Sequence, residues 1–394
     1  MTVALVALWS GLGLCVYVYA GYPALLLLLS RLRPRPIRQG DVQPSVSLIV
    51  PAYNEEETIE AKVRNALALR YPKDRLEILV ASDGSSDRTN EIVRREAGGS
   101  LQLLTLPRRG KAHALNEAAR RARGEILVFS DADVALDADS LLWLTRSYAD
   151  PEVGGVCGAR SQRASNGGAA EGGEGLYQRY DTWQTALESR IGSIASAHGA
   201  LYSVRRDLYV PIADPAQADD LAISARVPLH GYRMVYEPRA KSVQEAPVDG
   251  RGEFRRKIRV TNHTTRAILL LGRELAAHPL YAFAVISHKL LRYFVPFGLI
   301  TVFVAAAVLA PSHPEYALLL ALQAAFYGGA AAASRSRGGP LRRGRLFAVP
   351  YYFTLVNAAA FCGVLSILLG TRRSAWTPGG GLTASTHGSG RPAR

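Results

Sequence analysis

The sequence predicts an α/β domain with a mostly parallel sheet, placed between segments long and apolar enough to cross a membrane. Three observations support this prediction. Short β-rich runs alternate with helical stretches in the middle of the chain, uncharged apolar runs occur at both ends, and polar residues follow the predicted strands. Alternating strands and helices are typical of βαβ units, in which helices cover both faces of a parallel sheet.

The central region supplies the expected strands and helices in regular alternation. The predicted strands are 46–50, 76–81, 101–106, 126–129 and 153–159. The predicted helices are 56–69, 87–96, 112–122 and 139–148. No Gly-x-Gly-x-x-Gly follows the first strand and no Gly-Lys-Ser/Thr loop occurs, which disfavours a dinucleotide-binding fold and a P-loop phosphotransferase.

The N-terminal segment predicts a permanent transmembrane helix. Residues 1–30 carry no charged side chain, and the run 3–29 would be about 40 Å long as a helix, more than the roughly 30 Å hydrocarbon core requires. Basic residues follow this run and do not precede it, unlike in a cleavable signal peptide. We therefore expect the N-terminus outside and residue 31 onward inside.

The C-terminal third predicts further membrane segments. Runs 294–310 and 316–333 are each long enough to span, and the loop 334–345 that follows holds five arginines and no acid, which predicts a cytoplasmic position. Residues 281–292 suit an interfacial amphipathic helix. The uncharged run 346–370 is compatible with a further span, a re-entrant segment or an interfacial helix, and the sequence leaves this open.

The sequence predicts four parts along the chain, and its composition indicates which partners it contacts. The predicted parts are a transmembrane helix (1–30), a cytosolic α/β domain that ends in an interfacial helix region (31–279), interfacial and transmembrane helices (280–370) and a disordered tail (371–394). Lys plus Arg number 47 against 33 Asp plus Glu, a formal net charge of +14. The arginines cluster beside apolar segments, which predicts contact with membrane lipids and argues against nucleic acid. The three cysteines form no CxxC pair, so a disulfide framework is not expected.

An acidic pair after the fourth strand predicts a metal site. Asp131 and Asp133 are two residues apart and directly follow the buried run 126–129. Carboxylates so placed bind Mg²⁺ or Mn²⁺, hard cations that share ligands with substrate phosphates. A solvated helix N-cap is the alternative interpretation of an Asp-x-Asp triplet, and the preceding strand favours the metal site.

Other polar residues follow strands or begin helices in the same region. Asp83 ends the second strand, where a turn is the alternative to a ligand contact, and Lys111 begins a helix, where it could meet phosphate oxygens. Asp220, beside Asp219, could act as a general base because neighbouring carboxylates raise one pKa, although helix capping is the alternative. His198-Gly199 would allow an acceptor to approach closely, while a lone histidine is more often structural.

Together, in this order, these motifs resemble glycosyltransferase family 2, the inverting enzymes of the GT-A fold. The similarity covers about residues 46–259 and is strongest to the membrane-embedded branch that includes cellulose, hyaluronan and poly-N-acetylglucosamine synthases. The resemblance implies roles for individual residues. Nucleotide or diphosphate contacts are implied for Pro51, Tyr53, Glu55, Asp83, Lys111 and Asp131, a metal ligand for Asp133, the catalytic base for Asp220, and the acceptor site for His198 and Gly199.

One departure from the family pattern concerns processivity. Processive synthases carry Gln-x-x-Arg-Trp after the base, whereas residues 254–260 here contain neither Gln nor Trp. Arg256 and Arg259 remain candidates to bind the diphosphate. The departure favours transfer of a single sugar to a lipid, while the overall architecture favours polysaccharide synthesis.

The predicted function is inverting transfer of a sugar from a nucleotide-diphospho-sugar, with UDP as the expected nucleotide, to a polysaccharide or lipid acceptor. The expected location is a bacterial-type inner membrane, with the catalytic domain in the cytoplasm. The alternatives are a non-catalytic sugar-nucleotide sensor, which would tolerate loss of Asp220, and a transporter regulator. A transport pathway would need charged or broken spans, and the predicted spans are nearly free of acids.

Overall fold

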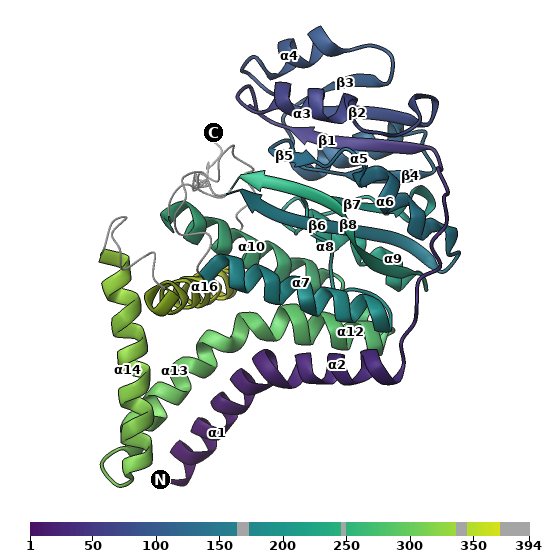
Figure 1. The fold of residues 1–394 in the computed structure, drawn as a ribbon. Helices are drawn as coiled ribbons and strands as arrows, with labels where there is room; N and C mark the ends of the chain where they lie inside the picture. Colours follow the sequence, from purple (N-terminus) through teal and green to yellow (C-terminus); the bar gives the residue numbers. More distant parts are fainter. Residues whose placement is uncertain (164–172, 246–249, 336–344, 371–394) are drawn as a thin grey trace, which may run out of the picture.

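The structure, a computed structural model, describes residues 1–163, 173–245, 250–335 and 345–370. The expected tail 371–394 and most of the arginine-rich loop 334–345 lie outside the described residues. The chain forms an α/β domain above a layer of long helices, and Figure 1 shows both parts.

One eight-stranded sheet forms the α/β domain, with strand order β3-β2-β1-β4-β7-β6-β8-β5. Neighbouring strands run parallel in β3-β2-β1-β4 and in β6-β8, and antiparallel at β4-β7, β7-β6 and β8-β5. The prediction of a mostly parallel sheet is thereby confirmed. The strands are β1 (Val46–Ala52), β2 (Leu76–Asp83), β3 (Leu101–Leu106), β4 (Ile126–Phe129), β5 (Val134–Leu136), β6 (Val153–Arg163), β7 (Tyr202–Arg205) and β8 (Arg233–Glu245).

Helices cover both faces of the sheet, as predicted. On β1, Leu48 belongs to one buried cluster and Ile49 to the cluster on the opposite face, which explains why the strand is an uninterrupted apolar run. The helices of this domain are α3 (Ile59–Leu67), α4 (Thr89–Glu96), α5 (Lys111–Arg121), α6 (Ser140–Arg146), α8 (Asp219–Ser224) and α9 (Arg226–Leu229). Helix α3 begins three residues later than predicted because Asn54 has a positive φ of 51° and residues 56–58 form a turn.

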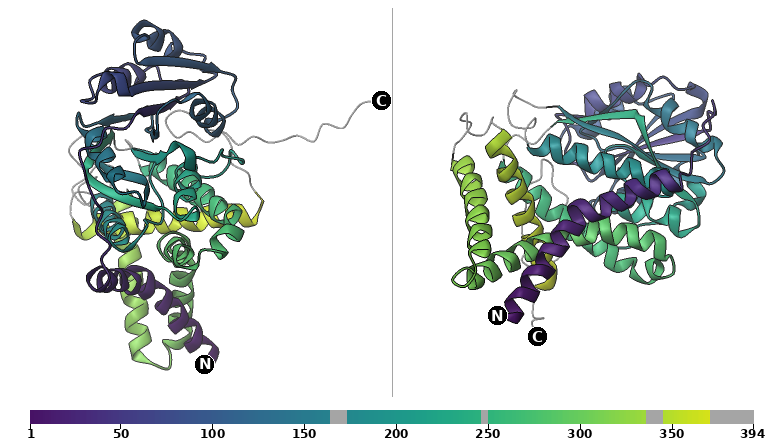
Figure 2. Two further views of the ribbon diagram at one scale, coloured as in Figure 1. Left: turned by 90° about the vertical axis from the view of Figure 1, so that its right-hand side faces the viewer. Right: turned by 60° about the horizontal axis from the view of Figure 1, so that its bottom comes forward.

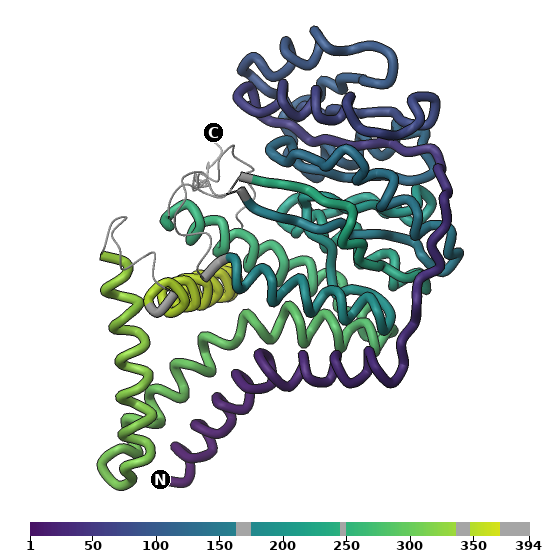
Figure 3. Tube along the Cα trace, viewed as in Figure 1, coloured from purple at the N-terminus to yellow at the C-terminus, as the bar shows by residue number. Residues whose placement is uncertain are grey.

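The N-terminal helix is continuous but changes its hydrogen-bond pattern midway. It comprises α1 (Thr2–Val16), the π-helical turn η1 (Tyr17–Gly21) and α2 (Tyr22–Leu32). Helix α1 packs closely on α13 (Leu291–Leu309), where a Cβ added to Gly11 would lie 2.8 Å from the carbonyl oxygen of Gly298. From Leu32 the chain climbs along one side of the domain to β1, as the tube in Figure 3 shows.

Four helices of the described chain are long and apolar enough to cross a membrane. They are Thr2–Leu32, Pro279–Leu309, Pro314–Arg335 (α14) and Phe347–Leu368, the last within α16 (Arg345–Leu368). In Figure 1 and in the left view of Figure 2, α16 runs crosswise to α14. It packs against α10 (Gly250–Leu270), where Asn262 donates a 2.7 Å hydrogen bond to Ser366.

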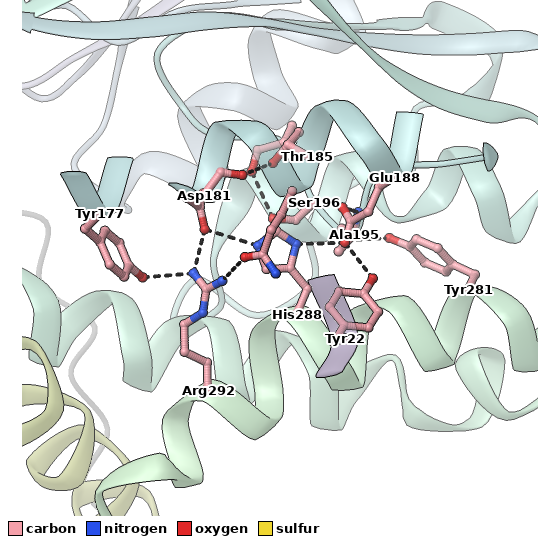
Figure 4. A network of polar contacts seen from close by, with 12 residues as sticks. Tyr22, Tyr177, Asp181, Thr185, Glu188, Ala195, Ser196, Tyr281, His288 and Arg292 are labelled. Atoms are coloured by element: carbon pink, nitrogen blue, oxygen red, sulfur yellow. Dashed lines mark hydrogen bonds and ion pairs between the residues drawn. The ribbon is translucent and has the colours of Figure 1, made fainter. Parts of the chain in front are cut away.

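Residues 281–292, expected from the sequence to form an amphipathic interfacial helix, are part of a longer helix. They belong to the long helix formed by α12 (Pro279–Val285), the π-helical turn η6 (Ile286–Leu290) and α13. His288 and Arg292 are only 1% and 7% exposed. They point at α7 (Gly173–Ile191), which lies between this helix and the sheet, and Figure 4 shows the resulting polar network. Both side chains therefore find their polar partners inside the protein, which a pattern of alternating polarity does not reveal.

Candidate functional site

The candidate site lies at the carboxyl ends of the parallel strands, where ligands bind in open α/β sheets. Strands β1, β2 and β4 run side by side in parallel, so the segments that follow them meet at one edge. Pro51 is within β1 in register with Ala81, and Tyr53 directly follows β1. Asp83 is the last residue of β2, and Asp131 lies two residues after β4.

A lysine joins two acidic segments that are far apart in the sequence. Lys111, the first residue of α5, places its Nζ 2.8 Å from Asp131 Oδ1 and 2.9 Å from Asp219 Oδ2. Burial alone would lower the pKa of Lys111, but the two carboxylates raise it above its usual range. Burial raises the pKa of Asp131, and Lys111 opposes that shift. The lysine is thus held charged beside the Asp-x-Asp turn.

The acidic groups around Asp133 suit a divalent cation that also binds substrate oxygens. Asp133 Oδ2 accepts a 2.8 Å hydrogen bond from Gln244 Nε2. Burial raises the pKa of Glu55, and the charges of Asp133 and Asp131 add to that effect, so the three carboxylates face one region. Among the described residues, no group of three or more His, Cys, Asp or Glu side chains could hold a metal ion alone. Phosphate oxygens or waters would complete the hard-oxygen ligand set.

Asp83 supports the loop that leads to Lys111. Its side chain is 0% exposed and accepts hydrogen bonds from the backbone N–H groups of Arg109 (2.8 Å) and Gly110 (2.8 Å), besides an ion pair with Arg108. The Arg108 guanidinium also lies 3.4 Å from the centre of the Tyr53 ring. Both carboxylate oxygens are therefore engaged by the loop, and direct contact of Asp83 with a nucleotide remains a prediction.

Asp220 has the electrostatic environment of a general base. Burial, followed by the neighbouring charge of Asp219, raises the pKa of Asp220 to about 6. Its Oδ1 accepts a 2.7 Å hydrogen bond from the backbone N–H of Leu221, at the start of α8. Asp219 binds Lys111 instead, so adjacent acids have different environments. Such a separation is typical of sites where one carboxylate takes up a proton near neutral pH.

His198 and Gly199 lie in the loop before β7, close to these acids. His198 Nε2 is 2.9 Å from the carbonyl oxygen of Gly158, and burial lowers the pKa of His198 to about 3. A Cβ added to Gly199 would lie only 2.8 Å from Asp131 Oδ2. Gly199 therefore leaves room for the Asp131 carboxylate, and its predicted contact with an acceptor is not tested by this geometry.

The two arginines of α10 have different surroundings. Arg256 donates to both carboxylate oxygens of Glu253 at 2.7 and 2.9 Å. Burial and the charge of Arg256 lower the pKa of Arg259, whereas Asp131, Asp219 and Asp133 act in the opposite direction. Arg259 therefore faces the acidic site, and a role in binding diphosphate remains a prediction for both.

Two residues that sequence reasoning missed also shape the site. Lys62, 2% exposed on α3, donates 2.7 Å hydrogen bonds to Ser130 Oγ and to the carbonyl oxygen of Val134, on either side of the Asp-x-Asp turn. Burial lowers the pKa of Lys62 to about 7. Asp219, considered only as a neighbour of Asp220, is the second partner of Lys111. The only sequence feature that points to Lys62 is weak: a lysine occupies one of the apolar positions of α3.

Comparisons with known proteins agree with this site. Residues 47–209 match the model of Glycosyl transferase family 2. Poly-beta-1,6-N-acetyl-D-glucosamine synthase of Staphylococcus aureus (strain COL) is 27% identical over 234 residues, which make up 58% of this chain and 56% of that protein. The probable glycosyltransferase YdaM of Bacillus subtilis (strain 168) is 27% identical over 233 residues, 55% of this chain and 54% of that protein. The match thus spans only a little over half the length of these relatives.

A solved structure matches over more of the chain. The mannosyltransferase PcManGT from Pyrobaculum calidifontis, in complex with GDP-Man and Mn²⁺, superposes with a TM-score of 0.68 and 27% identity. That match covers 91% of this chain and 98% of PcManGT.

The sheet, the strand-end acids and these matches define the class of protein as a glycosyltransferase of the GT-A fold. Residues 47–209 match the model of glycosyl transferase family 2, and four helices of the described chain are long and apolar enough to cross a membrane.

Proposed function

We propose that this protein transfers a sugar from a nucleotide-diphospho-sugar to a hydroxyl group of an acceptor at the membrane, with inversion at the anomeric carbon. The observation that carries the proposal is the Lys111 bridge between Asp131 and Asp219, directly beside Asp220. This arrangement places two groups at one edge of the sheet. Lys111 is a cation that can bind a diphosphate, and Asp220 is a carboxylate that can act as a general base.

The residues divide the chemistry between donor and acceptor. Asp220 takes the proton of the acceptor hydroxyl while its oxygen bonds to the anomeric carbon, and the bond from that carbon to the diphosphate breaks. Lys111 and Arg259 bind the departing nucleoside diphosphate, and Tyr53 and Asp83 line the nucleotide side. Asp133, with Asp131, would hold Mg²⁺ or Mn²⁺, which neutralises negative charge on the diphosphate. PcManGT is solved in complex with GDP-Man, so UDP-sugars and GDP-sugars are both candidate donors.

Replacing the base tests the mechanism. We expect Asp220→Asn to lose transfer by at least about a hundredfold while binding the donor normally, because general-base catalysis contributes about 10²–10⁴-fold. Asp74→Asn, a change of the same kind in the short turn before β2, is the matched control. The measurement is release of nucleoside diphosphate from UDP- and GDP-sugars by the full chain, and normal turnover by Asp220→Asn would exclude the base assignment.

Metal removal tests the predicted cofactor. Treatment with EDTA should stop transfer, and added Mn²⁺ or Mg²⁺ should restore it. Undiminished turnover in EDTA would remove the metal from the mechanism. The comparison of the two ions at equal concentration then identifies the better cofactor.

The acceptor and the topology complete the proposal. The missing Gln-x-x-Arg-Trp favours transfer of one sugar to a lipid over polymer synthesis, and product size with radiolabelled donor separates the two. We infer that the helices Thr2–Leu32, Pro279–Leu309 and Pro314–Arg335 cross an inner membrane, with the α/β domain in the cytoplasm. We also infer that α16 lies along the membrane surface, because it runs crosswise to α14. Cysteine labelling from each side of sealed vesicles would test this arrangement.

A further inference from the structure

A buried polar network joins α7 to the membrane helices and reaches the segment 192–199, which connects α7 to the turn before β7. Figure 4 shows the network, whose side chains come from the N-terminal helix, from α7 and from the long C-terminal helix. The members that bond to this segment, or are one hydrogen bond away from it, are Tyr22, Glu188, Tyr281 and His288. None of them is among the groups that the proposed transfer uses, so their role follows from what they hold in place.

The Glu188 carboxylate is the centre of this network, and its side chain is only 1% exposed. Its Oε1 accepts a 2.8 Å hydrogen bond from Tyr22 Oη and lies 2.8 Å from His288 Nδ1. Its Oε2 accepts a 2.9 Å hydrogen bond from the backbone N–H of Ala195. One buried carboxylate thus joins the N-terminal helix and the long C-terminal helix to the segment 192–199.

The other backbone group of Ala195 is also held by a side chain. Tyr281 Oη, in α12, donates a 2.9 Å hydrogen bond to the carbonyl oxygen of Ala195. Ala195 is 0% exposed and lies outside any helix or strand, and buried backbone groups need partners wherever they lie. Both backbone groups of Ala195 therefore depend on side chains from other elements, and the position of the segment follows those elements.

The same segment contacts both acidic sides of the candidate site. The backbone N–H of Ala197 donates a 3.1 Å hydrogen bond to Ser224 Oγ, in the helix α8 that contains Asp220. At the other end of the segment, a Cβ added to Gly199 would lie 2.8 Å from Asp131 Oδ2. A displacement of the segment would therefore change the space between the Asp-x-Asp turn and the proposed base.

Apolar packing reinforces this connection. Ala195, Leu221 and Tyr281 belong to one buried cluster, together with further residues of the long C-terminal helix. Leu221 is 1% exposed and directly follows Asp220 in the chain. Because protein interiors are closely packed, a shift of the long C-terminal helix would be transmitted to the segment and to the start of α8 together.

The segment also carries a polar atom that a ligand hydroxyl would satisfy. His198 Nε2 is 2.9 Å from the carbonyl oxygen of Gly158, which can only accept, so Nε2 carries the ring hydrogen. Burial lowers the pKa of His198 to about 3, so the ring is neutral and Nδ1 has a free lone pair. Nδ1 is buried without a hydrogen-bond partner among the residues that the structure describes. An acceptor hydroxyl is a donor of the kind that this atom lacks.

We propose that Glu188 and Tyr281 are positioning residues for the acceptor: by holding Ala195 they fix the segment 192–199 beside Asp220, so the membrane helices set the affinity for the acceptor and not for the donor. This inference rests on the proposed function and adds to it a contribution from the membrane helices. Neither residue contacts the reacting atoms, since each acts through the backbone of Ala195. The donor side does not depend on them, because Lys111 is held by contacts within the α/β domain.

The test removes one hydroxyl group from each of two buried tyrosines. Tyr281→Phe loses the hydrogen bond to Ala195, and Tyr71→Phe, the matched control, loses a bond of the same kind to the carbonyl oxygen of Pro44, which precedes β1. The full chain in detergent is assayed with UDP- and GDP-sugars as donors and with octyl glycosides of N-acetylglucosamine and mannose as acceptor probes. Tyr281→Phe should raise the acceptor KM about three- to tenfold, as expected for one neutral hydrogen bond, and change the donor KM by less than about twofold. Tyr71→Phe should change neither KM.

Hydrogen exchange followed by mass spectrometry tests the positioning without any acceptor. Peptides that cover the segment 192–199 should exchange about three- to tenfold faster in Tyr281→Phe, while those of α5 keep the wild-type rate. Glu188→Ala should accelerate exchange of the same peptides. Glu188→Gln should have little effect, because its amide oxygen still accepts from the N–H of Ala195.

The outcomes separate the inference from the proposed function. Unchanged exchange of the segment 192–199 in Tyr281→Phe or in Glu188→Ala overturns the role of that residue. Equal increases of the donor and acceptor KM, or an equal effect of Tyr71→Phe, overturn the inference as well, since they would indicate general destabilisation. If the wild type transfers sugar to neither octyl glycoside, the proposed function is refuted for these acceptors, and the exchange rates alone decide the inference.

Discussion

Gly199→Ala is the change that tests the geometry of the site most directly. The new Cβ would lie 2.8 Å from Asp131 Oδ2, whereas ordinary contacts begin at 3.4 Å, so the carboxylate must move by roughly 0.6 Å. Asp131 Oδ1 is 2.8 Å from Lys111 Nζ, and a shift of that size away from the lysine would stretch the pair to about 3.4 Å, longer than the usual 2.7–3.2 Å, and weaken it. Gly199 itself needs no unusual backbone conformation, so the effect comes from the contact.

The magnitude follows from the lost interaction. A hydrogen bond to a charged group contributes about 1.5–3 kcal/mol, and each 1.4 kcal/mol is about tenfold, so donor kcat/KM should fall about 10- to 150-fold. The assay is steady-state release of nucleoside diphosphate, with donor and acceptor concentrations varied separately. Gly192→Ala is the matched control, because a Cβ added there meets nothing within 4 Å.

Two results would refute this reasoning. Wild-type donor kinetics in Gly199→Ala would show that the Asp131 carboxylate tolerates the methyl group. An increase in the acceptor KM alone would show that Gly199 acts on the acceptor side, as the family resemblance implies, and not through Asp131. Equal losses in Gly192→Ala would mean that any added methyl disturbs the protein.

Three further predictions follow from other contacts. Asp220 must be deprotonated to act as a base, and its pKa is raised to about 6. The rate of transfer, measured between pH 5 and 8, should therefore fall about tenfold per pH unit below 6 and level off above it. A flat profile would contradict the assignment of Asp220 as the base. Gly363→Ala should lower the melting temperature in detergent, because its Cβ would lie 2.6 Å from Thr261 Cβ and the overpacking costs about 1–3 kcal/mol, whereas Gly328→Ala meets open space and should not. Lys62→Met should weaken Mn²⁺ binding by about tenfold, because the Asp-x-Asp turn loses two hydrogen bonds. The affinity is measured by electron paramagnetic resonance. Unchanged affinity would show that the turn keeps its conformation without Lys62.

The first four strands could be predicted because each is a short, mainly apolar run. Strands β1, β2 and β4 are buried throughout, and the edge strand β3 is partly exposed. Predicted limits for β3 and β4 agree with the structure, and β1 and β2 begin where expected. The later strands β7 and β8 mix polar and apolar residues, since Ser203 and Glu237 are buried there with hydrogen-bond partners. Such strands have no local signature, because partners from distant segments satisfy their polar groups.

The candidate site was predictable only in part for the same reason. A strand followed by an acidic turn is a local pattern, so Asp131 and Asp133 stand out in the sequence. Lys62 is 68 residues before Ser130 at the start of that turn, and the local sequence does not show which groups its ammonium contacts. Its ammonium group acquires a structural role only when α3 packs over the turn.

The sequence by itself determined the fold class, the membrane segments and the order of the strand-end acids, because each depends on residues close together in the chain. Only the tertiary structure decided that Lys111 joins Asp131 to Asp219 and that His288 and Arg292 turn inward. Those arrangements depend on packing between elements that are about a hundred residues apart in the sequence. Charge and hydrogen-bond partners at such separations are set by the folded core and not by local propensity.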